Sequence, residues 1–298
     1  MGGSVRSVGC EQMSRSTNQQ IGKSQISKKE IEREFRLLCE QVGRRGVIGF
    51  TSVEGVRLLP EQAAYLQRKL DGLGEWPVVS AAEPSDITAV SIGLLYHEAE
   101  ILAIPAGWVS KPAEDGSWNQ YARAYTELNR LLTGIASQLA ERFGGVAEGA
   151  TLEGWVDQVK HVNDYFPHCV SHRAFAEAAR VGWRGRSGLV VTPEAGPALR
   201  FATVFIPQRL SPDSRHLPDC GDCHACLEVC PLLRPEEGYR ERCRRRLKAL
   251  GLEDEVCGIC VRVCWEAVIP SRTVRSPAPP RVASEPAARA SVCPACLS

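Results

Sequence analysis

The chain has 298 residues, enough for one large domain or two modest ones, and 44% of them are apolar, so most of it is expected to fold. The formal net charge is only +1, which excludes a global electrostatic preference for nucleic acid or for a membrane surface. No apolar run reaches about 18 residues, so no segment is expected to span a bilayer. The N-terminal stretch is polar and has no apolar signal segment, which predicts a cytoplasmic protein.

The predicted elements alternate between helices and strands up to about residue 208. An unstructured leader is expected over residues 1–27, and after it the spacing of apolar residues distinguishes helices from short buried strands. In chain order, the predicted helices span residues 27–43, 60–74, 121–143 and 171–183, and the predicted strands span residues 46–50, 87–96, 188–193 and 199–207. The alternation indicates an α+β fold with an α/β-layered core over residues 28–208.

The chain is unusually rich in cysteine, with thirteen residues of this type. Eight of them fall between residues 220 and 264, and in a chain without a secretory signal such clustering favours metal binding over disulfides. Residues 211–270 are therefore predicted to form a second, cysteine-rich domain. Residues 271–298 are rich in proline, alanine and arginine and are expected to be a flexible tail.

The run "CGDCHACLEVCP", residues 220–231, has the spacing of bacterial ferredoxins. In that pattern the first three thiolates bind one [4Fe–4S] cube and the fourth binds a second cube, so four more cysteines must lie nearby. Cys257, Cys260 and Cys264 repeat the end of the run, and Cys243 precedes them across a stretched gap. The crossed pattern assigns the first cluster to Cys220, Cys223, Cys226 and Cys264, and the second to Cys230, Cys243, Cys257 and Cys260.

The alternative for this spacing is zinc, because zinc ribbons use two C-x2-C pairs. Zinc does not require a third cysteine at the same interval or a C-x3-C-P ending, so the spacing favours a ferredoxin-like domain with two [4Fe–4S] clusters. Two cubes in one small unit would lie close enough to exchange electrons. The predicted chemistry is therefore one-electron transfer.

The remaining cysteines give weaker signals. Cys293 and Cys296 form a C-x2-C pair that is either a redox or weak metal site, or an unstructured thiol pair. Cys169, in the sequence "HCVSH", is either a metal ligand or a buried small residue, and the second interpretation is preferred. Cys10 and Cys39 have no evident partners.

The segment in front of the cysteines carries a more specific signal. Residues 171–207 contain an A-E-x-A helix, then "GWRGRSGL", a strand, "PEAG" and a second strand that leads into the double cysteine run. This unit resembles the epoxyqueuosine reductase family, which is related to the corrinoid-dependent reductive dehalogenases. The helix "YARAYTELNRLL" (121–132) also resembles the family, so the resemblance covers roughly residues 85–270.

The resemblance implies a cobalamin-binding or nitroreductase-like core, in which a corrinoid is reduced by the nearer cluster. It places Gly182, Trp183, Gly185, Arg186 and Ser187 at the corrinoid pocket. The residues alone agree in part, because the glycines allow close backbone approach to a bulky ligand and an arginine can meet an anion. Taken without the resemblance, the same stretch is also typical of an ordinary helix-to-strand turn.

Two features depart from the family pattern. The family has an aspartate proton donor before the helix, and an ungapped count puts Phe166 there, so Asp164 or the Tyr165 hydroxyl is the candidate donor. Arg186 and Ser187 stand where the family has lysine and asparagine.

The chain has no room for the helical-repeat extension that some members use with tRNA, so tRNA is expected to be a doubtful substrate.

Two functional hypotheses follow. In the first, the protein is an oxidoreductase that relays electrons from a ferredoxin- or flavodoxin-type donor through the clusters to a small-molecule or nucleoside substrate. In the second, it is a ferredoxin-like electron carrier with an α/β docking domain. A third possibility is that the clusters only stabilise the fold and transfer no electrons. The basic run at residues 240–248 is interpreted as a solvated helix face beside anionic clusters rather than as a nucleic-acid site.

Overall fold

The computed structural model describes residues 26–71, 86–151, 160–233, 239–253 and 256–269. Most of the predicted leader and the predicted tail, with Cys10, Cys293 and Cys296, lie outside the described residues.

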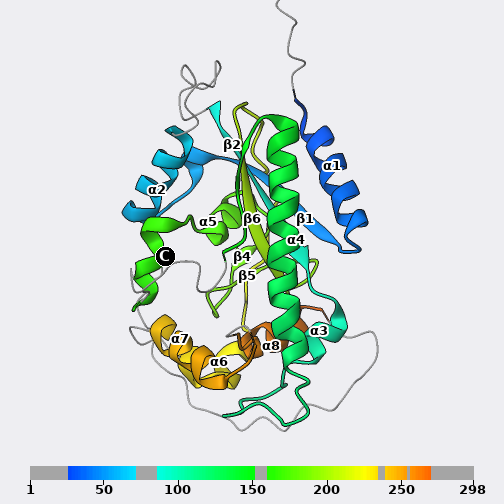
Figure 1. The fold of residues 1–298 in the computed structure, drawn as a ribbon, viewed down its shortest axis with the longest axis vertical. Helices are drawn as coiled ribbons and strands as arrows, with labels where there is room; N and C mark the ends of the chain where they lie inside the picture. Colours follow the sequence, from blue (N-terminus) through cyan, green and yellow to red (C-terminus); the bar gives the residue numbers. More distant parts are fainter. Residues whose placement is uncertain (1–25, 72–85, 152–159, 234–238, 254–255, 270–298) are drawn as a thin grey trace, which may run out of the picture.

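A four-stranded sheet forms the centre of the structure (Figure 1). The strand order is β1 (Gly46–Ser52), β2 (Thr88–Leu95), β6 (Leu199–Ile206) and β3 (Val146–Glu148). Neighbouring strands are antiparallel, with Ile48 opposite Ile92 and Val90 opposite Val204. The fold is therefore mixed helix and sheet, as predicted, but the alternation along the chain does not produce parallel β-α-β units in the described sheet.

Two long helices cover one face of the sheet. α1 (Lys28–Gln41) starts with a capping box, in which the Ser27 Oγ accepts from the Glu30 N–H and the Glu30 carboxylate accepts from the Ser27 N–H. α4 (Asn119–Phe143) runs along the sheet in Figure 1 and ends at Gly144, which has a left-handed φ of 62°. These helices enclose the main apolar core together with alternate residues of β2, whose whole length is buried.

The opposite face is covered by the short helix α5 (His172–Ala178). Ser171 caps its start, as predicted, and the Phe175 ring packs edge-on against Phe205 with 5.4 Å between centroids. The prediction that the helix extends to residue 183 is wrong. Arg180 adopts a left-handed φ of 54° and breaks the helix, so that Gly182 leads into a strand instead of following a helix end.

The segment after α5 forms a small two-stranded sheet of β4 (Trp183–Arg184) and β5 (Val190–Val191). The remaining elements of the N-terminal part are η1 (Val53–Gly55), α2 (Pro60–Asp71), α3 (Glu98–Leu102) and η3 (Val162–His168). Of these, only α2 corresponds to a predicted element.

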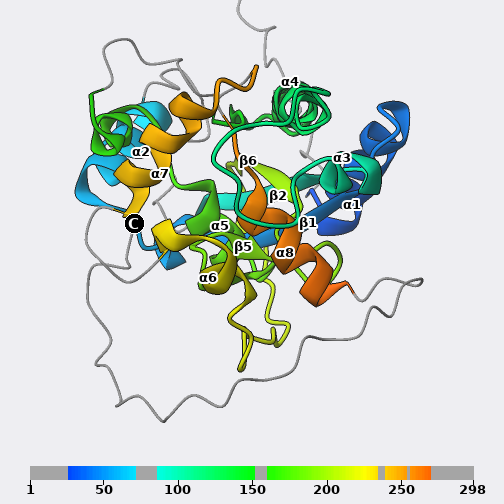
Figure 2. The same ribbon diagram turned by 90° about the horizontal axis from the view of Figure 1, so that it is seen from below.

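The cysteine-rich segment forms α6 (Ala225–Val229), η4 (Pro231–Leu233), α7 (Tyr239–Leu250) and α8 (Ile259–Val268). Figures 1 and 2 show α6, α7 and α8 together at one end of the sheet. The main core that contains α1 and α4 side chains also contains Leu250, Leu252, Val256, Ile259 and Val261. The cysteine-rich segment therefore shares its apolar core with the rest of the structure. Within the ranges described above, no helix is both long and apolar enough to cross a membrane.

Candidate functional site

The eight clustered cysteines come from three stretches of chain. Cys220 and Cys223 lie in the loop before α6, Cys226 lies on α6, and Cys230 follows it. Cys243 lies on α7, Cys257 precedes α8, and Cys260 and Cys264 lie on α8. Since α6 packs against α8, the two ends of the cysteine-rich segment meet. No disulfide joins any of the ten cysteines that the structure describes.

Four of these thiols form group one, defined as Cys220, Cys223, Cys226 and Cys264. The pKa of the Cys264 thiol is raised to about 12, first by burial and then by the negative charge of the other three thiolates. The pKa of Cys226 is likewise raised by burial and then by Cys220 and Cys223. The charges therefore interact within this group, although Cys264 lies far from the others in sequence.

The other four form group two, defined as Cys230, Cys243, Cys257 and Cys260. Burial raises the pKa of Cys260, and the thiolates of Cys243, Cys257 and Cys230 raise it further. The pKa of Cys230 is raised chiefly by burial, with a smaller contribution from Cys257. Cys226 of group one also acts on Cys260, so the two groups are neighbours. Their members are those of the quartets that the spacing predicts.

The chemistry of these donors suits iron–sulfur cubes. Several buried thiols whose pKa values are raised by mutual repulsion need a strongly positive partner before they can all ionise. Across the described part of the chain, no three His, Cys, Asp or Glu side chains are arranged to hold a single metal ion. A cube does not require that arrangement, because each of its irons takes one protein thiolate. The cluster assignments themselves remain predictions.

Backbone geometry shapes the loop of group one. Gly221 has a left-handed φ of 46°, and its N–H donates to the Asp219 carboxylate at 2.6 Å. Arg186 reaches this loop from the small sheet: its Nη2 donates to the Gly221 carbonyl at 2.7 Å and its Nε to the Cys223 carbonyl at 3.1 Å. The guanidinium thus fixes the cysteine loop, and its donors are directed at backbone carbonyls instead of at an anion.

The turn of group two is held by the start of α4. The Trp118 indole N–H donates to the Cys257 carbonyl at 2.7 Å. Gly258 has a left-handed φ of 76°, and a Cβ there would lie 2.6 Å from the Tyr121 ring. These contacts place the beginning of α8 against two aromatic side chains of the main core. Trp118 belongs to no motif noted in the sequence, and only its neighbourhood in the fold reveals its role.

Of the predicted corrinoid residues, Gly185 and Arg186 lie next to group one. A Cβ on Gly185 would lie 3.7 Å from the Cys220 sulfur and 2.8 Å from a Val191 methyl, so the backbone passes close to a cysteine there. The Ser187 hydroxyl accepts from the Leu189 N–H at 3.4 Å. The Trp183 indole nitrogen is buried and has no hydrogen-bond partner among the described residues. An unpaired buried donor is the observation that fits a further bound group at this position.

Asp164 caps the start of η3. Its carboxylate accepts from the Lys160 N–H at 2.7 Å and from the His161 N–H at 2.8 Å. The pKa of Asp164 is lowered by these backbone hydrogen bonds, with smaller contributions from the His161 and Arg244 charges. In this arrangement Asp164 is ionised at neutral pH, whereas a proton donor must hold its proton. Its role as the donor remains a prediction.

Comparison with known proteins finds similar curated sequences. No protein-family model matches the chain. The epoxyqueuosine reductase of Pseudomonas aeruginosa is 29% identical over 227 residues, covering 69% of this chain and 56% of that enzyme. The epoxyqueuosine reductase of Escherichia coli is 23% identical over 213 residues, covering 70% of this chain and 54% of that enzyme. The chain is thus similar to epoxyqueuosine reductases over about 70% of its length.

The epoxyqueuosine reductases to which the chain is similar are longer proteins. The chain spans little more than half the length of these curated relatives. A solved epoxyqueuosine reductase with an epoxyqueuosine-modified tRNA stem loop covers 79% of this chain and 65% of its own, with a TM-score of 0.43 and 20% identity.

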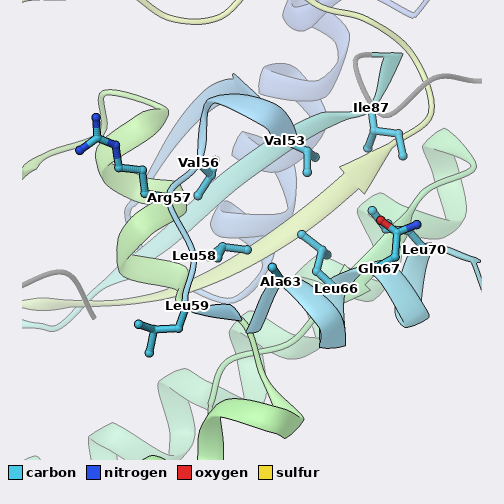
Figure 3. A pocket seen from close by; sticks show the side chains of 10 residues that line it. All are labelled: Val53, Val56, Arg57, Leu58, Leu59, Ala63, Leu66, Gln67, Leu70 and Ile87. Carbon is cyan, nitrogen blue, oxygen red and sulfur yellow. The ribbon is translucent and has the colours of Figure 1, made fainter. Parts of the chain in front are cut away.

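The protein also has an apolar pocket, of about 560 Å³, at the end of the sheet away from the cysteines (Figures 1 and 3). It lies between η1, α2 and the start of β2, and Leu58, Leu66 and Ile87 contribute to its wall. Arg57 is the one ionisable residue that lines it among those described. The pocket can accept apolar groups but has no acid, base or nucleophile for a reaction.

Two further cysteines that the structure describes, Cys39 and Cys169, are buried in the N-terminal part. Burial raises the pKa of Cys169 to about 11, with a contribution from Glu148, and raises the pKa of Cys39 to about 12. The Cys169 sulfur donates to the Tyr165 carbonyl. A neutral buried thiol of this kind agrees with the interpretation of Cys169 as a small packing residue.

Proposed function

We propose that this protein is an iron–sulfur oxidoreductase in which group one and group two each hold a [4Fe–4S] cluster and electrons pass between them one at a time. The observation that supports the proposal is the electrostatic coupling among the clustered thiols, in which Cys264 and Cys226 interact with group-one thiolates and Cys260 with group-two thiolates and with Cys226. The clusters, when bound, supply reversible one-electron storage at potentials that depend on burial, charge and hydrogen bonds. An external ferredoxin- or flavodoxin-type protein is the proposed electron donor.

The chain's own residues would hold and shield the clusters. The thiols of Cys226 and Cys260 are shielded from water. Bonds to iron would neutralise the negative charges of the thiolates, which otherwise repel one another strongly in such a site. Arg186 fixes the group-one loop, and Trp118 fixes the group-two turn. Rigid loops would keep the environment of each cluster the same in both redox states.

We further propose that the electron acceptor binds at residues 182–187, beside group one. The unpaired Trp183 indole N–H and the proximity of Gly185 to Cys220 support this position. The resemblance suggests cobalamin as the acceptor, with Gly182, Trp183, Gly185, Arg186 and Ser187 at its pocket. Arg186 would then act on the ligand indirectly, through the cysteine loop to which it donates.

The proposed substrate class is a nucleoside, either free or within tRNA. The name of the relatives points to a modified nucleoside, and one solved neighbour contains a modified tRNA stem loop. The expectation that tRNA is a doubtful substrate is therefore set aside in this proposal. Both forms therefore belong in any activity assay.

Reduction of the substrate by an electron pair would require a proton, which we assign to Asp164, with the Tyr165 hydroxyl as the alternative. Because the pKa of Asp164 is lowered where it caps η3, those hydrogen bonds would have to open when substrate binds. Asp164→Asn should slow turnover by roughly 100-fold or more if it is the donor. Tyr165→Phe is the comparison, and the variant that is slow at full iron content identifies the donor.

The deciding experiment is purification under strict exclusion of oxygen, with iron, sulfide and zinc measured per chain. The proposal expects about eight irons and about eight sulfides. Cys264→Ser should remove the group-one cluster and Cys260→Ser the group-two cluster, each leaving about four irons. Zinc in place of iron, or far less iron in the wild-type protein, would overturn the proposal.

Cobalamin binding separates a reductase from a pure electron carrier. Titration of the reduced protein with cob(II)alamin should change the cobalt absorbance, and Trp183→Phe should weaken binding because it removes the unpaired N–H. No change at high protein concentration would favour the carrier hypothesis and leave the clusters in place.

A further inference from the structure

Arg246 lies on α7, the helix that also carries the predicted cluster ligand Cys243. It follows Cys243 by three residues, so the two side chains lie on neighbouring positions of one helix face. The guanidinium carbon lies 3.6 Å from the centroid of the Trp108 ring, and Nη2 donates to the Val109 carbonyl at 2.5 Å. Both partners belong to the connection between α3 and α4. Two contacts therefore fix the guanidinium, although Trp108 itself is 38% exposed.

Neither of these contacts uses the Nε–H of the guanidinium. Arg246 Nε is buried and has no hydrogen-bond partner among the described residues. Cys243, which belongs to group two, lies three residues before Arg246 on the same helix. An unpaired buried N–H one helical turn from a group-two cysteine requires an acceptor, since leaving such a donor unpaired is unfavourable.

We propose that Arg246 donates its Nε–H to a sulfur of the group-two cluster and raises the reduction potential of that cluster. The inference rests on the proposed function, because it requires a cluster in group two. Adding an electron makes a cluster more negative, so a nearby fixed cation and a hydrogen bond to sulfur stabilise the reduced form. The Trp108 ring and the Val109 carbonyl prevent the guanidinium from turning out to water.

A purely structural role predicts something different. If Arg246 only tied α7 to the connection between α3 and α4, its loss would loosen the helix and leave the potential unchanged. The reduction potential is therefore the readout that separates the two roles. It also does not depend on the substrate or on turnover.

The experiment is an anaerobic redox titration followed by electron paramagnetic resonance, with Arg246→Met in full-length protein. Arg246→Met should lower one of the two midpoint potentials and leave the other unchanged. In a Cys264→Ser background, which keeps only group two, the remaining signal should shift; in a Cys260→Ser background it should not. Arg246→Lys keeps the charge but not the Nε–H, so its shift should be smaller.

The matched control is Arg245→Met, an exposed neighbour on the same helix, which should leave both potentials as in wild type. Unchanged potentials in an Arg246→Met protein with full iron content would overturn the inference. If that variant loses iron, Trp108→Leu and Arg246→Lys replace it, and unchanged potentials in both would overturn it equally. Wild-type protein without a second cluster would instead overturn the proposed function.

Discussion

The Trp118 indole N–H donates to the Cys257 carbonyl at 2.7 Å and thereby joins the start of α4 to the turn that begins α8. Trp118 is almost fully buried, so water cannot easily replace this bond. The residue that positions a predicted cluster ligand is thus part of the main apolar core. Cluster retention and fold stability should depend on each other at this point.

Trp118→Phe keeps an aromatic ring but leaves the Cys257 carbonyl without its donor. We expect the free energy of unfolding to fall by about 1–3 kcal/mol. Iron should also leave group two faster when a chelator is added. Denaturant titration and the time course of iron release measure the two effects, and wild-type values in both would show that the contact is incidental.

Gly258 and Gly221 offer a matched pair of substitutions. Both have positive φ, but a Cβ on Gly258 would meet the Tyr121 ring at 2.6 Å, whereas a Cβ on Gly221 would meet nothing within 4 Å. Gly221→Ala should therefore cost only the left-handed strain, about 1–2 kcal/mol. Gly258→Ala should cost a further 1–3 kcal/mol or so from overpacking. Equal losses in denaturant titrations would mean that the ring moves aside freely.

Arg186 should control how firmly group one holds its metal. Arg186→Lys cannot bridge the Gly221 and Cys223 carbonyls at once, because an ammonium lacks the planar pair of donors. The side chain is exposed, so we expect a loss of only about 1 kcal/mol in stability. Iron release from group one should nevertheless become faster. Arg130→Lys, at an exposed ion pair with Glu127, is the control and should release iron at the wild-type rate.

The sequence predicts the elements well where a local signal exists. Ser27 and Glu30 mark the start of α1, and the period of apolar residues marks α4. The end of α5 is missed because a non-glycine residue, Arg180, takes the left-handed conformation. The antiparallel order of the sheet is also beyond local signals, since it depends on which strands become neighbours.

In the candidate site too, some features follow from the sequence and others depend on which segments the fold brings together. The assignment of the cysteines to two groups comes from the crossed ferredoxin pattern in the sequence and stays a prediction, with which the electrostatic coupling of Cys260 and Cys264 agrees. The contacts made by Trp118 and Arg246 join segments that are distant in the sequence, and no sequence motif predicts them. The interaction of Arg186 with the cysteine loop likewise requires the small sheet to lie beside that loop.

His172 should make stability depend on pH. It is buried on α5, with Nε2 placed to donate to the Gly149 carbonyl at 2.8 Å and Nδ1 placed to accept from the Thr203 hydroxyl at 3.0 Å. The neutral ring satisfies both contacts. Burial lowers the pKa of His172 to about 4, with smaller contributions from the Arg200 and Lys69 charges.

Because the folded-state pKa of His172 lies below the unfolded value of about 6.5, the unfolded chain binds the extra proton first as pH falls. The loss of stability should therefore be absent above pH 6.5 or so, reach about 1 kcal/mol near pH 5.5, and approach roughly 3 kcal/mol below pH 4. His172→Gln should remove this slope, and His161→Gln, at an exposed histidine, should keep it. Anaerobic denaturant titrations across this range measure the slope, and parallel curves for wild type and His172→Gln would contradict the assignment.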